Sequence, residues 1–222
     1  MRNREQEAEQ YIKNLIRSGE SQELDFKFEI SNAQKLARTL SAFANTDGGK
    51  LLIGVKDNGK IAGVRSDEEA YMAESAAHIF CKPEVIFKIK RWDVSGKSVL
   101  EVDIPVSRHK PHFARNEEGK WVAYVRVNDQ NIRANNVLLH VWKKKERRAG
   151  AWLKFGREEQ ALMDYLAENE SVTLSRFIRV AKTNFATAEK ILVSLILMDV
   201  IQMELTEKTT YYRLNKEHKS LL

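Results

Sequence analysis

The sequence contains little cysteine, proline or glycine, and it has no long apolar run. Among its 222 residues Cys81 is the single cysteine, which excludes an internal disulfide and a zinc site built from cysteines. Ten glycines and three prolines are too few for a low-complexity chain. No run of about 18 apolar residues could span a membrane, and the N-terminal MRNREQEAEQ lacks the apolar core of a signal peptide. We therefore expect a cytoplasmic globular protein.

Charged residues are plentiful and carry a positive surplus. They make up 31% of the chain, and the formal net charge is +6. A surplus of this sign favours a polyanionic partner such as nucleic acid, although many basic proteins bind none. The length of the chain suits one domain followed by a smaller one.

The hydrophobic periodicity changes near Gly150, which we take as a domain boundary. Before it, helical spacing alternates with short strand-like runs, which predicts an α+β domain over residues 1–148. Hairpin signals such as Asn58-Gly59, expected as a type I′ turn, indicate small, mixed and mostly antiparallel sheets with helices packed on them. The expected helices cover 4–17, 32–45, 66–80 and 136–148, and the expected strands cover 24–28, 51–55, 61–64, 85–92, 99–106 and 121–127.

The remainder, residues 156–216, has a different pattern. It predicts three helices and then a two-stranded ribbon, which is the order of elements in a winged helix-turn-helix domain. The helices are expected at 157–168, 173–181 and 184–198, and the strands at 201–205 and 211–214.

The stretch SAFANTDGGKLLIGVKDNG at 41–59 suggests a phosphate-binding loop, because a Gly-Gly-Lys precedes an apolar run. It fails the pattern G-x-x-x-x-G-K-[ST], since Ala44 stands in place of the first glycine and Leu51 in place of the serine or threonine. A helix leads into the stretch, so the helix end near Gly48 is a C-terminus, whose partial negative charge repels phosphate. We therefore predict no ATP or other cofactor, and we expect Gly48 and Gly49 to end the helix.

Three ordered motifs resemble the Schlafen-type Alba domains, a family associated with DNA binding. They are ESQELDFK at 20–27, SAFANTDGG at 41–49 and LIGVKDNGKIAGV at 52–64, with further similarity at KPHF (110–113) and AYVRV (123–127). The resemblance covers about residues 10–135 and implies a nucleic-acid-binding domain, with double-stranded DNA as the expected partner. Two positions depart from the family pattern, because Asp25 replaces a glutamate and Lys56 stands where many relatives carry an acidic residue.

The resemblance also implies a set of carboxylates. In some animal Schlafen proteins an equivalent trio belongs to a metal-dependent RNA-cleaving site, and the matching residues are Glu20, Asp25 and Asp57. They would hold Mg²⁺ or Mn²⁺ to activate water, with Lys27 on a phosphate oxygen. The alternative is that Glu20 and Asp25 only flank a strand and that Asp57 starts a turn. The shorter Asp25 favours this alternative, because it draws one ligand back by about one methylene.

Basic residues of the first domain should share one face if the strands pair as in the resembled fold, and they would then contact phosphates in a salt-sensitive way. A solvated surface of mixed charge is the alternative. In the second domain, the third helix and the ribbon would meet DNA, although many winged helices contact proteins instead. The candidate nucleic-acid contacts are Lys27, Lys50, Lys56, Lys60, Arg65, Arg108, Lys110, Arg115, Arg126 and Arg133, followed by Thr187, Lys190 and Lys208.

The sequence therefore predicts a DNA-binding transcriptional regulator that needs no metal or cofactor. Two alternatives stay open at this point. One is a metal-dependent ribonuclease that uses the carboxylate trio. The other is an interaction adaptor that forms homodimers through the winged helix.

Overall fold

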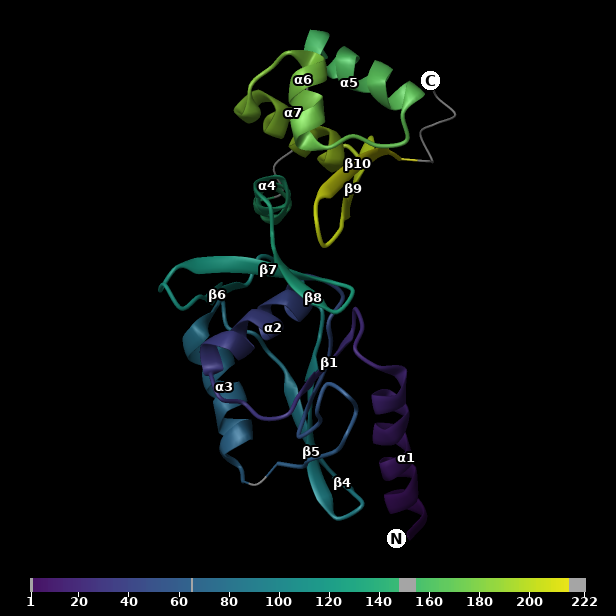
Figure 1. Cartoon of the computed structure of the whole chain (residues 1–222). Helices are drawn as coiled ribbons and strands as arrows, with labels where there is room; N and C mark the ends of the chain where they lie inside the picture. Colours follow the sequence, from purple (N-terminus) through teal and green to yellow (C-terminus); the bar gives the residue numbers. More distant parts are fainter. Residues whose placement is uncertain (1, 65, 148–154, 216–222) are drawn as a thin grey trace. The chain divides into compact units, whose positions relative to one another are not determined.

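The computed structural model describes residues 2–64, 66–147 and 155–215. The chain divides into two compact units, of which unit 1 is Met1–Ala134 and unit 2 is Asn135–Leu222. Figure 1 colours unit 1 from purple to teal and unit 2 from teal to yellow. The two units are described separately below.

The boundary between the units precedes helix α4 (Asn136–Glu146), which the periodicity assigned to the first domain. Val137 and Val141 of α4 belong to the same buried cluster as Leu192 of unit 2. The apolar face of α4 therefore packs inside unit 2, and the two compact units divide between residues 134 and 135. The domain bounds of 1–148 and 156–216 stay a prediction.

A four-stranded sheet forms the centre of unit 1. Its strands are β1 (Leu24–Lys27), β2 (Gly49–Ile53), β4 (Lys88–Val94) and β5 (Lys97–Ile104), in the order β1-β2-β5-β4. β1 and β2 run parallel, whereas the other two pairs are antiparallel. In β2, Leu51 and Ile53 join one buried cluster and Leu52 joins another, which is the alternation that a strand imposes.

Helices cover both faces of this sheet (Figure 1). α1 (Arg2–Ser18) packs on one face, where Ile12 joins Phe26 and Leu52 in a buried cluster. α2 (Ala33–Asn45) and α3 (Glu68–Phe80) supply the helical part of the cluster on the other face. Apolar residues at helical spacing on these three helices therefore account for the burial of the sheet.

A second sheet lies against α2. It is antiparallel and consists of β3 (Cys81–Lys82), β6 (Phe113–Arg115), β7 (Trp121–Val127) and β8 (Gln130–Arg133), in that order. Ala114 and Tyr124 of this sheet join the buried cluster that contains α2, so α2 lies between the two sheets. Of these strands the sequence predicted β7 alone, because the others have two to four residues, too few for an alternation to be visible.

The sequence predicted that glycine ends α2 and that Asn58-Gly59 forms a type I′ turn, and the structure bears on both predictions. Gly48 has a φ of +77°, and its N–H donates to the carbonyl oxygen of Phe43 at 2.9 Å just after α2 ends, so the prediction for Gly48 is confirmed. Gly49 instead begins β2. The type I′ prediction for Asn58-Gly59 is wrong, because Asn58 does not have the positive φ that this turn requires. Val55 forms a β-bridge with Ile61, so the turn between them is longer than the two residues of a type I′ turn.

Unit 2 consists of helices followed by a two-stranded ribbon. After α4 come α5 (Arg157–Glu168), α6 (Leu174–Ala181), α7 (Phe185–Leu197), β9 (Ile201–Leu205) and β10 (Thr210–Leu214). β9 and β10 are antiparallel, and Val172 forms a β-bridge with Tyr212 of β10. The α+β class with small mixed and antiparallel sheets is thus confirmed. No described helix of either unit is both long and apolar enough to cross a lipid bilayer.

A buried carboxylate fastens α1 to the first sheet. Glu101 of β5 is 4% exposed and accepts three hydrogen bonds. The Tyr11 hydroxyl donates to Oε1 at 2.8 Å, the Lys50 ammonium donates to Oε1 at 2.7 Å, and Trp92 Nε1 donates to Oε2 at 2.6 Å. Burial alone would raise the pKa of Glu101, but the three donors hold this pKa below its usual value.

We expect Glu101→Ala to lower the free energy of unfolding by about 2–4 kcal/mol, because it leaves three donors without their acceptor. Asp103→Ala is the matched control, since Asp103 contacts the same lysine at 3.2 Å but its side chain is 53% exposed. It should cost less than about 1 kcal/mol. Urea unfolding of both variants measures the difference, and equal costs would contradict the assigned role of Glu101.

The same carboxylate predicts a loss of stability in acid. Because the pKa of Glu101 is lower in the folded chain, its contribution is fully present above the unfolded value of about 4.5 and is lost as the pH falls through the folded value. Thermal melting between pH 3 and 7 should therefore show a smaller acid-induced loss in Glu101→Gln than in the wild type. An unchanged pH profile would be evidence against the argument.

Candidate functional site

A cleft of about 620 Å³ opens in unit 1 beside β1, α2 and the β6–β8 part of the second sheet. We call it the charged cleft, because six carboxylates and five basic side chains line it. The carboxylates are those of Glu20, Asp25, Asp57, Glu117, Glu118 and Asp129, and the basic side chains are those of Lys27, Lys35, Arg38, Arg115 and Arg126.

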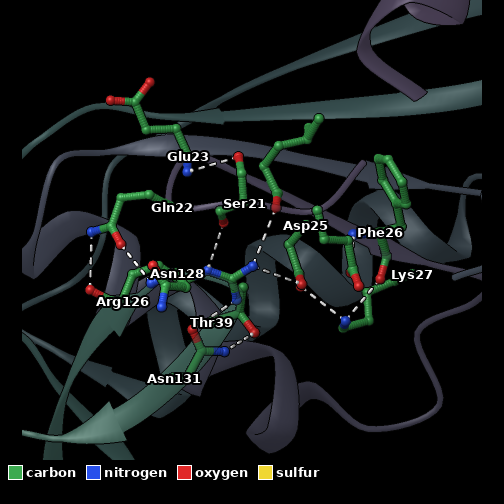
Figure 2. Close-up of polar contacts among 12 residues, drawn as sticks. Ser21, Gln22, Glu23, Asp25, Phe26, Lys27, Thr39, Arg126, Asn128 and Asn131 are labelled. Carbon is green, nitrogen blue, oxygen red and sulfur yellow. Dashed lines mark hydrogen bonds and ion pairs between the residues drawn. The ribbon is translucent and has the colours of Figure 1, made fainter. Parts of the chain in front are cut away.

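Asp25 is the buried carboxylate of the charged cleft, with 4% of its surface exposed. Alternation along β1 puts Asp25 and Lys27 on the same face of the strand. Lys27 Nζ lies 2.8 Å from Asp25 Oδ2, and Arg126 Nη2 lies 3.2 Å from Asp25 Oδ1 (Figure 2). Two cations therefore neutralise this one carboxylate.

Arg126 of β7 is 1% exposed, and its guanidinium is fully engaged inside the unit. Nε donates to the carbonyl oxygen of Ser21 at 3.1 Å, Nη1 to Asn131 Oδ1 at 3.1 Å, and Nη2 to the carbonyl oxygen of Leu24 at 3.2 Å (Figure 2). The prediction that Arg126 contacts phosphate is therefore corrected, because it joins the second sheet to the segment before β1. A lone arginine inside the apolar run WVAYVRV was the signal that it is buried.

Arg126 and Gln22 hold the segment ESQELDFK against β7 and the residues that follow it. Gln22 Nε2 donates to the carbonyl oxygen of Arg126 at 3.0 Å, and Gln22 Oε1 accepts from the backbone N–H of Asn128 at 2.8 Å. Asn131, in turn, donates to Thr39 Oγ1 at 3.0 Å. Gln22, Thr39 and Asn131 escaped the sequence analysis, because uncharged polar residues give no signal without their neighbours.

Glu20 lies next to Asp25 at the same cleft. Its Oε1 accepts from the backbone N–H of Phe26 at 2.9 Å. Burial raises the pKa of Glu20 above its usual value, the Phe26 N–H opposes this, and the neighbouring Asp25 carboxyl adds to the rise. Asp57 is exposed in the turn after β2 and also lines the cleft. The structure therefore brings all three carboxylates of the predicted trio to one cleft.

The arrangement does not fit a divalent metal ion. Within the described residues, no group of three histidine, cysteine, aspartate or glutamate side chains is placed to hold a metal. Asp25 already faces two cations, and Glu20 already accepts a backbone hydrogen bond. A divalent ion would need these oxygens as ligands at about 2.0–2.6 Å.

The predicted basic residues of unit 1 differ in their surroundings, and whether the exposed ones share one face stays a prediction. Lys50 pairs with Glu101 and Asp103, which raises its pKa and gives it a structural role rather than the predicted phosphate contact. Lys110 Nζ donates to the carbonyl oxygen of Thr46 at 3.0 Å, and Arg65 lies outside the described residues. Exposed side chains away from the charged cleft are those of Lys56, Lys60, Arg108 and Arg133.

Two basic residues of the cleft were missed by the sequence analysis. Lys35 and Arg38 lie on the exposed side of α2 and line the cleft. In unit 2, Lys190 of α7 and Lys208 between β9 and β10 are exposed, and Thr187 is half-buried. These three positions agree with the elements on which they were predicted.

Arg126 and Asp25 should behave as a coupled pair. We expect Arg126→Met to lower the free energy of unfolding by about 3–5 kcal/mol, because it removes one of the two cations that compensate the buried Asp25. Adding Asp25→Asn should recover about 1–3 kcal/mol of that loss. A double-mutant cycle by urea unfolding measures the coupling, and strictly additive costs would rule it out.

Comparison with known proteins identifies the family of the chain. A family described as Schlafen, AlbA_2 matches residues 20–135, which is more than half of the chain. No curated protein is significantly similar to the chain.

Two solved structures are similar in part. The DIP2311 protein from Corynebacterium diphtheriae is 21% identical, with a TM-score of 0.42, over 69% of this chain and 27% of that one. The N-terminal domain of a RecG-related protein from Nitrosomonas europaea is 24% identical, with a TM-score of 0.40, over 58% of this chain and 93% of that one. The chain thus spans about a quarter of the DIP2311 protein. By the family match over residues 20–135, the chain belongs to the Schlafen, AlbA_2 family.

Proposed function

We propose that this chain is a DNA-binding protein that regulates transcription. The observation that carries the proposal is the membership of unit 1 in the Schlafen, AlbA_2 family, which suggests nucleic-acid binding. The net charge of +6 supports it, because a cationic protein attracts a polyanion over a long range.

The interior of the charged cleft contributes little to this attraction, because its six carboxylates balance its five basic side chains. The proposed phosphate contacts of unit 1 are therefore exposed side chains that form no ion pair with another described residue. They are Lys56, Lys60, Arg108 and Arg133. Each neutralised phosphate would add to the salt dependence of binding.

We also propose that unit 2 is a winged helix-turn-helix with α7 as its DNA-reading helix. Three residues separate α6 from α7, and the first of them, Lys182, has a left-handed φ of 52°, as suits a tight turn between two helices. Lys190 would then face DNA from α7 and Lys208 from the ribbon. Glu189 of α7 does not oppose this role, because it is buried and lies 3.3 Å from His140 Nδ1 of α4.

The basic side chains of unit 2 can be tested by salt dependence. We expect Lys190→Ala/Lys208→Ala to weaken binding to duplex DNA and to reduce the slope of log affinity against log salt by about 1.8, or about 0.9 for each lost contact. Fluorescence anisotropy at several salt concentrations gives both quantities. The matched control, Lys13→Ala/Lys88→Ala, removes the same charge from α1 and β4 and should change the slope less.

Two outcomes would contradict the proposal. One is a wild-type chain that fails to bind duplex DNA at about 50 mM salt, or binds it without salt dependence. The other is an equal change of slope in both double variants, which would assign the effect to net charge rather than to α7 and the ribbon.

A metal-dependent ribonuclease is the second candidate function. Its support is the convergence of Glu20, Asp25 and Asp57 on one cleft, and the two cations on Asp25 oppose it. Incubation of tRNA with Mn²⁺ distinguishes the two functions. Cleavage by the wild type that is lost in Asp57→Ala would favour the ribonuclease, whereas absent or unchanged cleavage would favour DNA binding alone. Homodimerisation through unit 2 stays a prediction.

A further inference from the structure

The Lys27 ammonium has a fixed place in the charged cleft. Its Nζ lies 2.8 Å from Asp25 Oδ2 and donates to the carbonyl oxygen of Phe26, also at 2.8 Å. The strand backbone and the Asp25 carboxylate thus hold it on two sides (Figure 2). The side chain is 41% exposed, so the ammonium lies where the buried end of the cleft meets solvent.

Asp25 depends on this ammonium. Its side chain is 5% exposed, and Oδ2 forms no hydrogen bond with any described residue. Arg126 reaches only the other oxygen, Oδ1. The ionic contact with Lys27 is therefore what compensates the charge at Oδ2, because a buried carboxylate without a counter-charge is strongly disfavoured.

A divalent ion that used Asp25 would have to bind the same oxygen, because Arg126 already lies on Oδ1. Lys27 lies against Asp25 Oδ2, and Glu20 and Asp57 line the same cleft. An ammonium at 2.8 Å and a metal ion at about 2.0–2.6 Å cannot share that position on one oxygen, and their charges repel.

We propose that Lys27 is the resident cation of the charged cleft. It takes the place that a divalent metal ion would need beside Asp25, so the wild-type chain binds no Mg²⁺ or Mn²⁺ there. Removing the ammonium frees Asp25 to bind such an ion together with water. Lys27 thereby determines which cation this acidic cleft accepts. The proposal is independent of DNA binding, because it concerns the cleft in the absence of nucleic acid.

Mn²⁺ binding tests the proposal directly. The Mn²⁺ electron paramagnetic resonance signal gives the bound fraction, and thermal melting gives a second readout on the full chain without nucleic acid. The variants are Lys27→Met, which keeps the length of the side chain without its charge, and Lys27→Met/Asp25→Asn. Lys35→Met is the matched control, since Lys35 also lines the cleft but pairs with Glu117 at the surface at 3.6 Å.

We expect no saturable Mn²⁺ binding to the wild type or to Lys35→Met. Lys27→Met should bind Mn²⁺ and gain about 3–6 °C in melting temperature at ten times its dissociation constant. Lys27→Met/Asp25→Asn should lose both effects, because the central ligand is removed.

Two results would overturn the proposal. The first is saturable Mn²⁺ binding by the wild type that disappears in Asp25→Asn, a comparison that holds even if Lys27→Met does not fold. The second is a folded Lys27→Met that binds no Mn²⁺. Neither depends on DNA, so a failure of the proposed DNA binding would be recognised separately.

Discussion

The ion pair between Arg126 and Asp25 joins the two sheets of unit 1, and the geometry of the charged cleft depends on it. Burying two charges is unfavourable unless their remaining hydrogen-bonding capacity is satisfied. Here the guanidinium also donates to Ser21, Leu24 and Asn131 and lies 5.0 Å from the centre of the Phe43 ring. The segment before β1 is therefore fixed against β7. Because Glu20 lies in that segment and Lys27 lies on β1 two residues after Asp25, their positions follow from the same pair.

The charged residues of unit 1 thus fall into two groups, those paired inside the fold and those exposed to solvent. Carboxylates and basic side chains balance inside the charged cleft, and Lys50 is neutralised by Glu101 and Asp103 on β5. The basic residues that keep an uncompensated charge are exposed ones outside these networks. A count of lysines and arginines along the sequence therefore overstates the positive surface, since Arg126 and Lys50 serve the fold.

Periodicity predicted most of the fold because the helices bury one regular face. α2 and α7 carry apolar residues at helical spacing, whereas β7 is an apolar run that is buried at four successive positions, Ala123 to Arg126. The short strands β3 and β8 could not be predicted, since they exist only through pairing with β6 and β7. The carboxylate trio was found through its motif. The partners of those carboxylates were not, because Asp25 and Arg126 are 101 residues apart and the contact arises only on folding.

The packing of α1 separates the family segment from the folding unit. The family match begins at residue 20, after α1 has ended, yet Ile12 of α1 is fully buried against Phe26 and Leu52. A fragment cut at residue 20 would expose an apolar sheet face and leave Glu101 without its Tyr11 donor. The core of unit 1 thus includes residues outside the segment that the family match covers, and fragments for biochemical work should keep α1.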